Sequence, residues 1–410
     1  MMEQPLPGQE LTAPQTLEAP AEPDIADGDL GQQQITSGRQ VELDHSIGFS
    51  GSAIDSVHVH PSVREYCLIA GSSIVVRDIQ DPHNQHFLTA HDDMITCLTI
   101  SSNGNLLASG QKGENSDIVV WDFTTKQAIY RLSEHDHEVS NLAFSHDDRL
   151  LLSTGNTLDG KMFIWNMANG HIVAQMPLIP SVFAEAPRCV AWGGMVKDVK
   201  LRLTTNYQFA VSGAKKMTLW QLVPQTGQLL SEIISTGTHV RDYICMAFSK
   251  NQEDYLVAGT NSGDVCGFHV KSKQLVFCLN LCALGVRTIR AVSPTNFVCG
   301  GGDGQVFSIA LNGKNTAVAT KTQFFGAIHG LTASPDGLQS LVATDKGYLY
   351  RLRNQDFSQM LLCENHVQPV LSAWFMPGVS DKFITCSEDG TVRLWDSNTY
   401  AVTARCQAAA

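Results

Sequence analysis

The sequence predicts an all-β protein folded as a closed β-propeller. Short strand-like apolar runs recur at an even spacing, and turns rich in Gly, Asn and Asp separate them. No segment has helical periodicity over ten residues. Evenly spaced short strands favour a closed architecture in which each repeat forms one four-stranded blade and neighbouring blades cover its apolar faces.

The repeat can be followed from one position, at which a strand-like run ends in a large side chain. Successive occurrences are 44, 44, 55, 48, 41, 43 and 43 residues apart, close to the period of about 40–45 residues of a propeller blade. The eight occurrences are Arg77, Trp121, Trp165, Trp220, Phe268, Ile309, Leu352 and Trp395. Histidines recur in phase with them, because His91 and His135 are also 44 residues apart. The sequence therefore predicts eight blade-like repeats.

Eight repeats can be arranged in two ways. One is a single eight-bladed ring. In the other, which we predict, residues 41–361 form a seven-bladed propeller and residues 362–410 form an extra repeat outside it. We expect the run "VELDHSIGF" (41–49) to close the ring as the outer strand of the blade centred on Leu352, because an N-terminal strand can pair one open edge only.

The first forty residues differ in composition from the rest. Residues 1–40 are rich in Pro, Glu and Asp and contain no aromatic side chain, so burial cannot offset the entropy lost on ordering them. We predict a disordered acidic tail. It lacks the basic start and apolar run of a signal peptide. No stretch approaches eighteen consecutive apolar residues, so we expect no membrane contact.

The charge, the cysteine pattern and the motifs argue against several classes of function. The formal net charge is −12, from 40 acidic against 28 basic side chains, which argues against nucleic-acid binding. The eleven cysteines contain no C-x-x-C pair, so we interpret them as reduced thiols rather than as metal ligands. No G-x-S-x-G or H-E-x-x-H motif occurs, and "CGGGDG" lacks the Lys-Ser/Thr ending of a phosphate loop. We therefore predict no enzyme activity, no cofactor and no metal.

The recurring Trp-Asp ends resemble the WD-repeat family from residue 41 onward. That resemblance implies a hydrogen-bonded set in each blade: the tryptophan indole, a Ser or Thr on the preceding strand, a loop histidine and an Asp in the tight turn. The matching residues are His135, Ser153, Asp159 and Trp165 in one blade, His366, Thr385, Asp389 and Trp395 in another, and His91, Ser109 and Trp121 in a third whose Asp is undetermined. We expect the blades without tryptophan to rely on apolar packing.

Longer strings carry a closer resemblance. "HDDMITCLTISSNGNLLASGQ" and "KFITCSEDGTVRLWD" are similar to the amino-terminal half of a WD-repeat family of motile cilia and flagella that has two tandem propellers. The runner-up is the echinoderm microtubule-associated protein-like family. The closer resemblance implies that residues 362–410 are the first blade of a second propeller that is missing here.

The closer resemblance also implies a function. It predicts a structural scaffold of the cytoskeleton, in the axoneme of cilia and flagella, that binds tubulin in the inner wall of the doublet microtubule together with other axonemal proteins. The alternative is a cytosolic adaptor such as a substrate receptor of a ubiquitin ligase. Such adaptors often carry Trp-Asp-x-Arg, whereas Phe123-Thr124 and Ser397-Asn398 follow the two Trp-Asp pairs here.

The 55-residue interval before Trp220 contains the longest interruption of the repeat. Because this chain is acidic, contact with an acidic partner such as tubulin requires a local basic patch or an uncharged, shape-complementary face. Our candidate contact residues are Lys197, Lys200, Arg202, Lys215 and Lys216. The alternative is a solvated loop and an ordinary charged turn.

Overall fold

The computed structural model describes residues 43–49, 51, 54–179, 182, 185–198, 200, 202–213, 215–251 and 254–407. Every regular element in these ranges is a strand, and the strands form eight four-stranded antiparallel sheets. The all-β prediction is therefore confirmed. The predicted tail, residues 1–40, lies outside the described residues.

Each sheet uses four consecutive strands, and we number the sheets in chain order. Sheets 1 and 2 contain β1 (Val57–Val59), β2 (Glu65–Ala70), β3 (Ser73–Asp78), β4 (Gln85–Thr89), β5 (Ile95–Ile100), β6 (Leu106–Gln111), β7 (Ile118–Asp122) and β8 (Gln127–Leu132). Sheets 3 and 4 contain β9 (Val139–Phe144), β10 (Leu150–Gly155), β11 (Lys161–Asn166), β12 (Ile172–Pro177), β13 (Cys189–Lys197), β14 (Leu203–Gly213), β15 (Lys216–Val223) and β16 (Gln228–Ile233).

The remaining sheets follow the same order. Sheets 5 and 6 contain β17 (Tyr243–Phe248), β18 (Tyr255–Thr260), β19 (Asp264–His269), β20 (Gln274–Asn280), β21 (Val286–Ala291), β22 (Asn296–Gly301), β23 (Gln305–Ala310) and β24 (Ala317–Gln323). Sheets 7 and 8 contain β25 (Ile328–Ala333), β26 (Gln339–Thr344), β27 (Tyr348–Arg353), β28 (Gln359–Glu364), β29 (Val370–Phe375), β30 (Lys382–Ser387), β31 (Thr391–Asp396) and β32 (Val402–Gln407).

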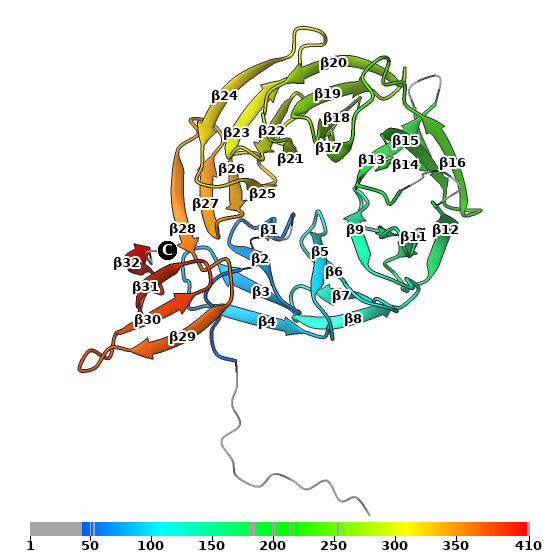
Figure 1. Cartoon of the computed structure of the whole chain (residues 1–410). Coiled ribbons are helices and arrows are strands. Elements are labelled where there is room, and N and C mark those ends of the chain that lie inside the picture. Colours follow the sequence, from blue (N-terminus) through cyan, green and yellow to red (C-terminus); the bar gives the residue numbers. More distant parts are fainter. Residues whose placement is uncertain are drawn as a thin grey trace, which may run out of the picture. The chain divides into compact units, whose positions relative to one another are not determined.

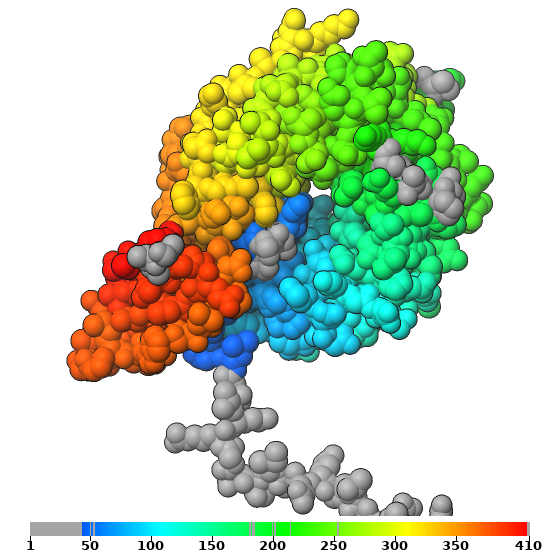
Figure 2. Space-filling view, in the orientation of Figure 1, coloured from blue at the N-terminus to red at the C-terminus, as the bar shows by residue number. Residues whose placement is uncertain are grey.

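Sheets 1 to 7 form a closed ring, and sheet 8 lies outside it (Figure 1). The first strands of these seven sheets contact one another in sequence order, and β25 of sheet 7 contacts β1 of sheet 1. The Asp55 amide donates to the His329 carbonyl across this closure at 2.8 Å. Sheet 8 protrudes from the rim of the ring (Figure 2). The predicted propeller of seven blades and one extra repeat is confirmed.

The core consists of seven apolar clusters, one at each interface between neighbouring sheets of the ring. The cluster that closes the ring packs Val57 and Leu68 of sheet 1 against Leu341 and Leu349 of sheet 7. None of these seven clusters contains a residue of sheet 8. Ring closure therefore rests on side-chain packing between two complete sheets.

The structure corrects the predicted way of closing the ring. Within the expected strand 41–49, residues 43–49 form no strand, and residues 41 and 42 lie outside the described residues. Sheet 7 already has its own outer strand, β28, so its edge offers this segment no vacant position. The segment instead contacts sheet 8 and the loop that leads to it: His45 stacks on Tyr400 of sheet 8, and the Asn365 side chain of the loop donates to the Phe49 carbonyl at 3.2 Å.

The structure also bears on the expected boundary between the ring and the extra repeat. The boundary at 361/362 falls inside β28, which runs from Gln359 to Glu364 and belongs to sheet 7. Sheet 8 begins at β29. The sequence repeat and the sheet differ in phase, because each repeat starts with the outer strand of the preceding sheet.

Candidate functional site

The structure brings together the four residues expected in sheet 3. The Trp165 indole donates to the Ser153 hydroxyl at 2.9 Å. His135 lies between that hydroxyl and Asp159, with its Nε2 and Nδ1 atoms each 2.9 Å from one of them. Asp159 also accepts a backbone N–H from the loop that carries the histidine. Burial raises the pKa of Asp159, but these hydrogen bonds outweigh burial and leave the pKa below its ordinary value.

Sheet 8 repeats this set with threonine in place of serine. The Trp395 indole donates to Thr385 Oγ1 at 2.7 Å. His366 bridges Thr385 and Asp389, at 2.7 Å and 2.8 Å. Hydrogen bonds from Thr391 and His366 outweigh the effect of burial and hold the pKa of Asp389 far below its ordinary value. Both complete sets therefore join a loop, a turn and two strands of one sheet.

Sheet 2 uses a residue that the sequence analysis missed. Trp121 donates to Ser109 at 3.0 Å, and His91 Nε2 lies 2.6 Å from the same hydroxyl. The aspartate position is taken by the Gln111 side chain, whose carbonyl oxygen lies 2.7 Å from His91 Nδ1. Gln111 in turn donates to Asp92. The signal was present in the sequence, since Gln111 directly follows "LLASG", but the family pattern has an aspartate in this role and not an amide.

Sheet 4 has the tryptophan without its hydroxyl partner. Val211 occupies the position that Ser153 has in sheet 3, two residues after the strand partner of the tryptophan. Among the described residues the Trp220 indole N–H has no hydrogen-bond partner, and the ring stacks on Phe209. The sheets of the ring without tryptophan have Leu68, Ala258, Cys299 and Val342 at the hydroxyl position. Most residues of the polar sets in sheets 2, 3 and 8 are buried.

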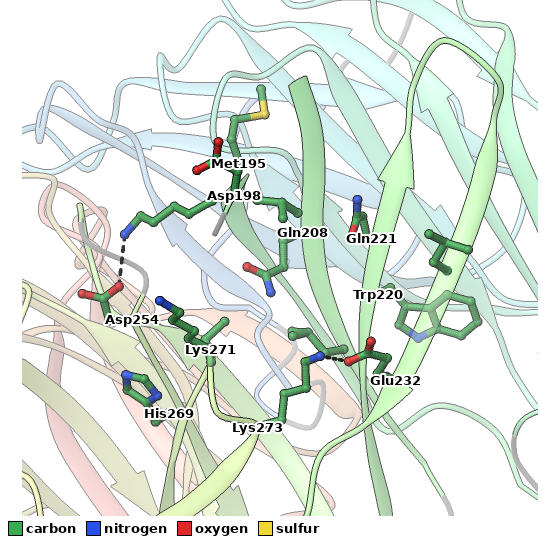
Figure 3. A pocket seen from close by; sticks show the side chains of 15 residues that line it. Met195, Asp198, Gln208, Trp220, Gln221, Glu232, Asp254, His269, Lys271 and Lys273 are labelled. Atoms are coloured by element: carbon green, nitrogen blue, oxygen red, sulfur yellow. Dashed lines mark hydrogen bonds and ion pairs between the residues drawn. The ribbon is translucent and has the colours of Figure 1, made fainter. Parts of the chain in front are cut away.

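An open groove lies between sheets 4 and 5 (Figure 3). The volume of the groove is about 470 Å³. Strands β13 and β14 contain nine and eleven residues, whereas most strands of the ring contain six, so their hairpin extends beyond its neighbours. The groove is lined by both apolar and polar side chains: Leu219, Leu230, Val270, Gln208, Gln221 and His269.

Ion pairs hold the two sides of the groove together. Lys197 of sheet 4 lies 3.0 Å from Asp254 of sheet 5, and Lys273 of the β19–β20 turn pairs with Glu232 of β16 (Figure 3). Lys271 also lines the groove, and within the described part of the chain it has no ion pair. The groove therefore offers one unneutralised ammonium group beside amide and apolar side chains, which suits an acidic extended segment.

The candidate contact residues divide into two groups. Lys197 lines the groove, and Lys200 and Arg202 lie in the same hairpin, where Arg202 pairs with Asp198. Lys215 and Lys216 are exposed at the other end of β14. Eleven extended residues separate the two ends by roughly 35 Å, so the two groups do not form one patch.

The side of the groove formed by sheet 5 was not predicted from the sequence. Lys271 and Lys273 belong to the sheet after the one that contains Lys197. No local spacing connects these residues, and packing between adjacent sheets brings them together. Among the described residues, no group of three or more His, Cys, Asp or Glu side chains is placed to hold a metal ion. That part of the chain likewise contains no helix with the length and hydropathy to span a bilayer.

Three stretches of the chain match a known family model. The family model described as WD domain, G-beta repeat matches residues 83–122, 126–166 and 359–396. Each match begins in or just before the outer strand of one sheet and ends at or near the third strand of the next. Among solved structures, the WD40 repeats of RRP9 align with a TM-score of 0.59 at 18% identity, covering 74% of this chain and 89% of that one. A chain of the mitotic checkpoint complex aligns with a TM-score of 0.61 at 13% identity, covering 86% and 100%. These structural likenesses support the fold alone.

Curated relatives match most of the chain. Cilia- and flagella-associated protein 52 of Mus musculus is 27% identical over 372 residues, covering 87% of this chain and 56% of the relative. The protein of the same name from Chlamydomonas reinhardtii is 29% identical over 368 residues, with the same coverage. The chain thus spans little more than half the length of these relatives. Three stretches of the chain match the WD domain, G-beta repeat model, and over most of its length the chain is similar to cilia- and flagella-associated protein 52.

Proposed function

We propose that this protein is a non-enzymatic structural scaffold of motile cilia and flagella that binds axonemal doublet microtubules from the inside. The observation that carries the proposal is the similarity to cilia- and flagella-associated protein 52 over 87% of the chain, in an alga and in mammals. Similarity of that extent covers many repeats, whereas the dipeptide Trp-Asp alone is common to many propellers.

The geometry supports a scaffold. A closed ring with seven packed interfaces is rigid, and it presents loops at both ends of its strands for simultaneous contacts. The groove between sheets 4 and 5 is the contact site that we favour, with Lys271 as the cation that meets an acidic segment of the partner. Lys197 lines the same groove, and the other two basic side chains of the β13–β14 hairpin, Lys200 and Arg202, follow it in sequence.

The test is retention in the axoneme. A tagged chain expressed in ciliated cells is expected to localise to the axoneme and to remain there after detergent and high-salt extraction. Lys271→Glu is expected to reduce retention several-fold, and Lys314→Glu, an equal charge change at an exposed turn of sheet 6, is the matched control. A diffuse pool that detergent removes completely would favour the cytosolic adaptor instead.

We also propose that sheet 8 is the first blade of a second propeller. Its inner strand β29 exposes Val370, Leu371, Trp374 and Phe375 by 51%, 66%, 59% and 69%. An apolar inner strand with this exposure requires a neighbouring blade. A chain extended by the residues that follow in the curated relatives is expected to protect β29 amides from hydrogen exchange. Unchanged exchange of β29 in the extended chain would refute this assignment.

A further inference from the structure

Two cysteines of sheet 5 lie directly opposite each other on neighbouring strands. Cys266 of β19 and Cys278 of β20 are register partners, and their Sγ atoms are 2.7 Å apart. That separation is shorter than the van der Waals contact of two sulfur atoms. All eleven cysteines are among the described residues, and no other two of them are hydrogen-bonded to each other through their sulfur atoms.

The backbone at this pair already suits a covalent bridge. Directly opposed residues of antiparallel strands have Cα atoms about 4.5–5.5 Å apart, and disulfides span about 4.4–6.8 Å. A bridge therefore requires side-chain rotation and no displacement of either strand. We propose that Cys266 and Cys278 form a redox-modification site, at which a peroxide converts the dithiol into a cross-strand disulfide.

The surroundings assign different roles to the two thiols. Cys278 is partly exposed, whereas Cys266 is buried in the apolar cluster between sheets 4 and 5. The hydrogen bond with Cys266 lowers the pKa of Cys278, and it raises the pKa of Cys266, which keeps its proton. Asp264 raises the pKa of Cys278, and Arg241, which is paired with Asp264 at 2.7 Å, lowers it by less, so the hydrogen bond with Cys266 decides the direction. Cys278 is therefore the thiol that meets the oxidant, and Cys266 is the resolving thiol.

The chemistry balances with hydrogen peroxide as the oxidant. The Cys278 thiolate attacks one peroxide oxygen, the O–O bond breaks, and the departing hydroxide takes a proton to become water. Cys278 is then a sulfenic acid. The Cys266 sulfur attacks the Cys278 sulfur, the S–O bond breaks, and the proton of Cys266 leaves with the hydroxide as a second water. In total, two thiols are oxidised to one disulfide and one peroxide is reduced to two waters.

A bridge here joins the outer strand of sheet 5 to its neighbour and closes the turn that carries Lys271 and Lys273. A cross-link restricts the unfolded chain more than the folded one. The oxidised protein is therefore expected to melt at a temperature higher by about 5 °C than the reduced protein.

The test is peptide mapping of the full chain after oxidation under native conditions. The folded protein is treated with hydrogen peroxide, denatured with N-ethylmaleimide to alkylate the remaining thiols, and digested with trypsin. Trypsin cleaves after Lys271 and Lys273, between the two cysteines, so a disulfide appears as two joined peptides that a reducing agent separates. We expect this joined species and no alkylated Cys266 or Cys278.

Two variants show which cysteine is joined to Cys266. Cys282 lies in the same tryptic peptide as Cys278, so Cys282→Ser is the matched control and is expected to keep the joined species. Cys278→Ser is expected to abolish it. The proposal fails if Cys266 and Cys278 are both alkylated after a treatment that oxidises the exposed Cys406, and it fails equally if the joined species depends on Cys282.

Discussion

Sheets 3 and 8 contain the same polar set and differ in what surrounds it. In both, a tryptophan, a hydroxyl, a histidine and an aspartate are hydrogen-bonded at 2.7–2.9 Å. Trp165 and Trp395 are each only 2% exposed. The first strand of sheet 3 is mostly covered by its neighbours, whereas four large apolar side chains of β29 are more than half exposed. The hydrogen-bonded set therefore forms within a single sheet, and burial of the inner strand requires neighbouring sheets.

The tryptophans test this difference most strongly. Trp165→Ala is expected to lower the free energy of unfolding of the ring by about 3–5 kcal/mol, because it removes a large core side chain and leaves the Ser153 hydroxyl without its donor. Trp395→Ala is expected to leave the main transition unchanged, since sheet 8 shares none of the seven apolar clusters. Urea unfolding followed by circular dichroism measures both. Equal losses in the two variants would mean that sheet 8 unfolds together with the ring.

Much of this comparison could be predicted from the sequence. The period located all eight sheets, and the residues matching the family pattern proved to be neighbours in sheets 3 and 8. The way the ring closes was not predictable from the period. Each sequence repeat begins with an outer strand such as β4 or β28, whereas that strand is the last one of its sheet. The groove was not predictable either. Lys197 and Lys271 are brought together only by packing between two sheets, and spacing along the chain does not encode that contact.

Asp159 predicts a smaller effect on the free energy of unfolding, and this effect depends on pH. The pKa of Asp159 is lowered in the folded chain, so its ionised form stabilises the fold above the unfolded value of about 3.9, and this contribution is lost as the pH falls from there toward the folded pKa. Asp159→Asn is expected to cost about 1–3 kcal/mol at pH 7 and less at pH 3. Urea titrations at both pH values measure this. A cost that grows on acidification would contradict the assigned sign.

Removing sheet 8 tests whether the ring keeps its stability without that sheet. Deletion of residues 367–410 retains β28 and is expected to change the melting temperature of the ring by no more than about 3 °C, because the ring closes between sheets 7 and 1. Solubility is expected to rise, since the exposed side chains of β29 are removed. Calorimetry and light scattering measure the two effects. Unfolding of the shortened chain would place sheet 8 within the cooperative unit of the ring.

The smallest expected effect concerns a sheet in which the polar set is incomplete. Val211 is fully buried on the same face as the Trp220 indole and directly opposite Thr218. Among the described residues, neither the indole nitrogen of Trp220 nor the hydroxyl of Thr218 has a hydrogen-bond partner. Val211→Thr supplies a hydroxyl that can accept from the indole, so its net effect on the free energy of unfolding is expected to stay within about 0.5 kcal/mol.

Val342 provides the matched control, because it is equally buried at the same position of sheet 7, where Leu352 replaces the tryptophan. Val342→Thr introduces a hydroxyl with no indole to donate to it and is expected to cost about 1–3 kcal/mol. The difference between the two variants measures what the indole and the opposing Thr218 hydroxyl contribute together, since the change in side-chain volume is the same in both. If the two costs are equal, the hydroxyl at 211 meets neither group.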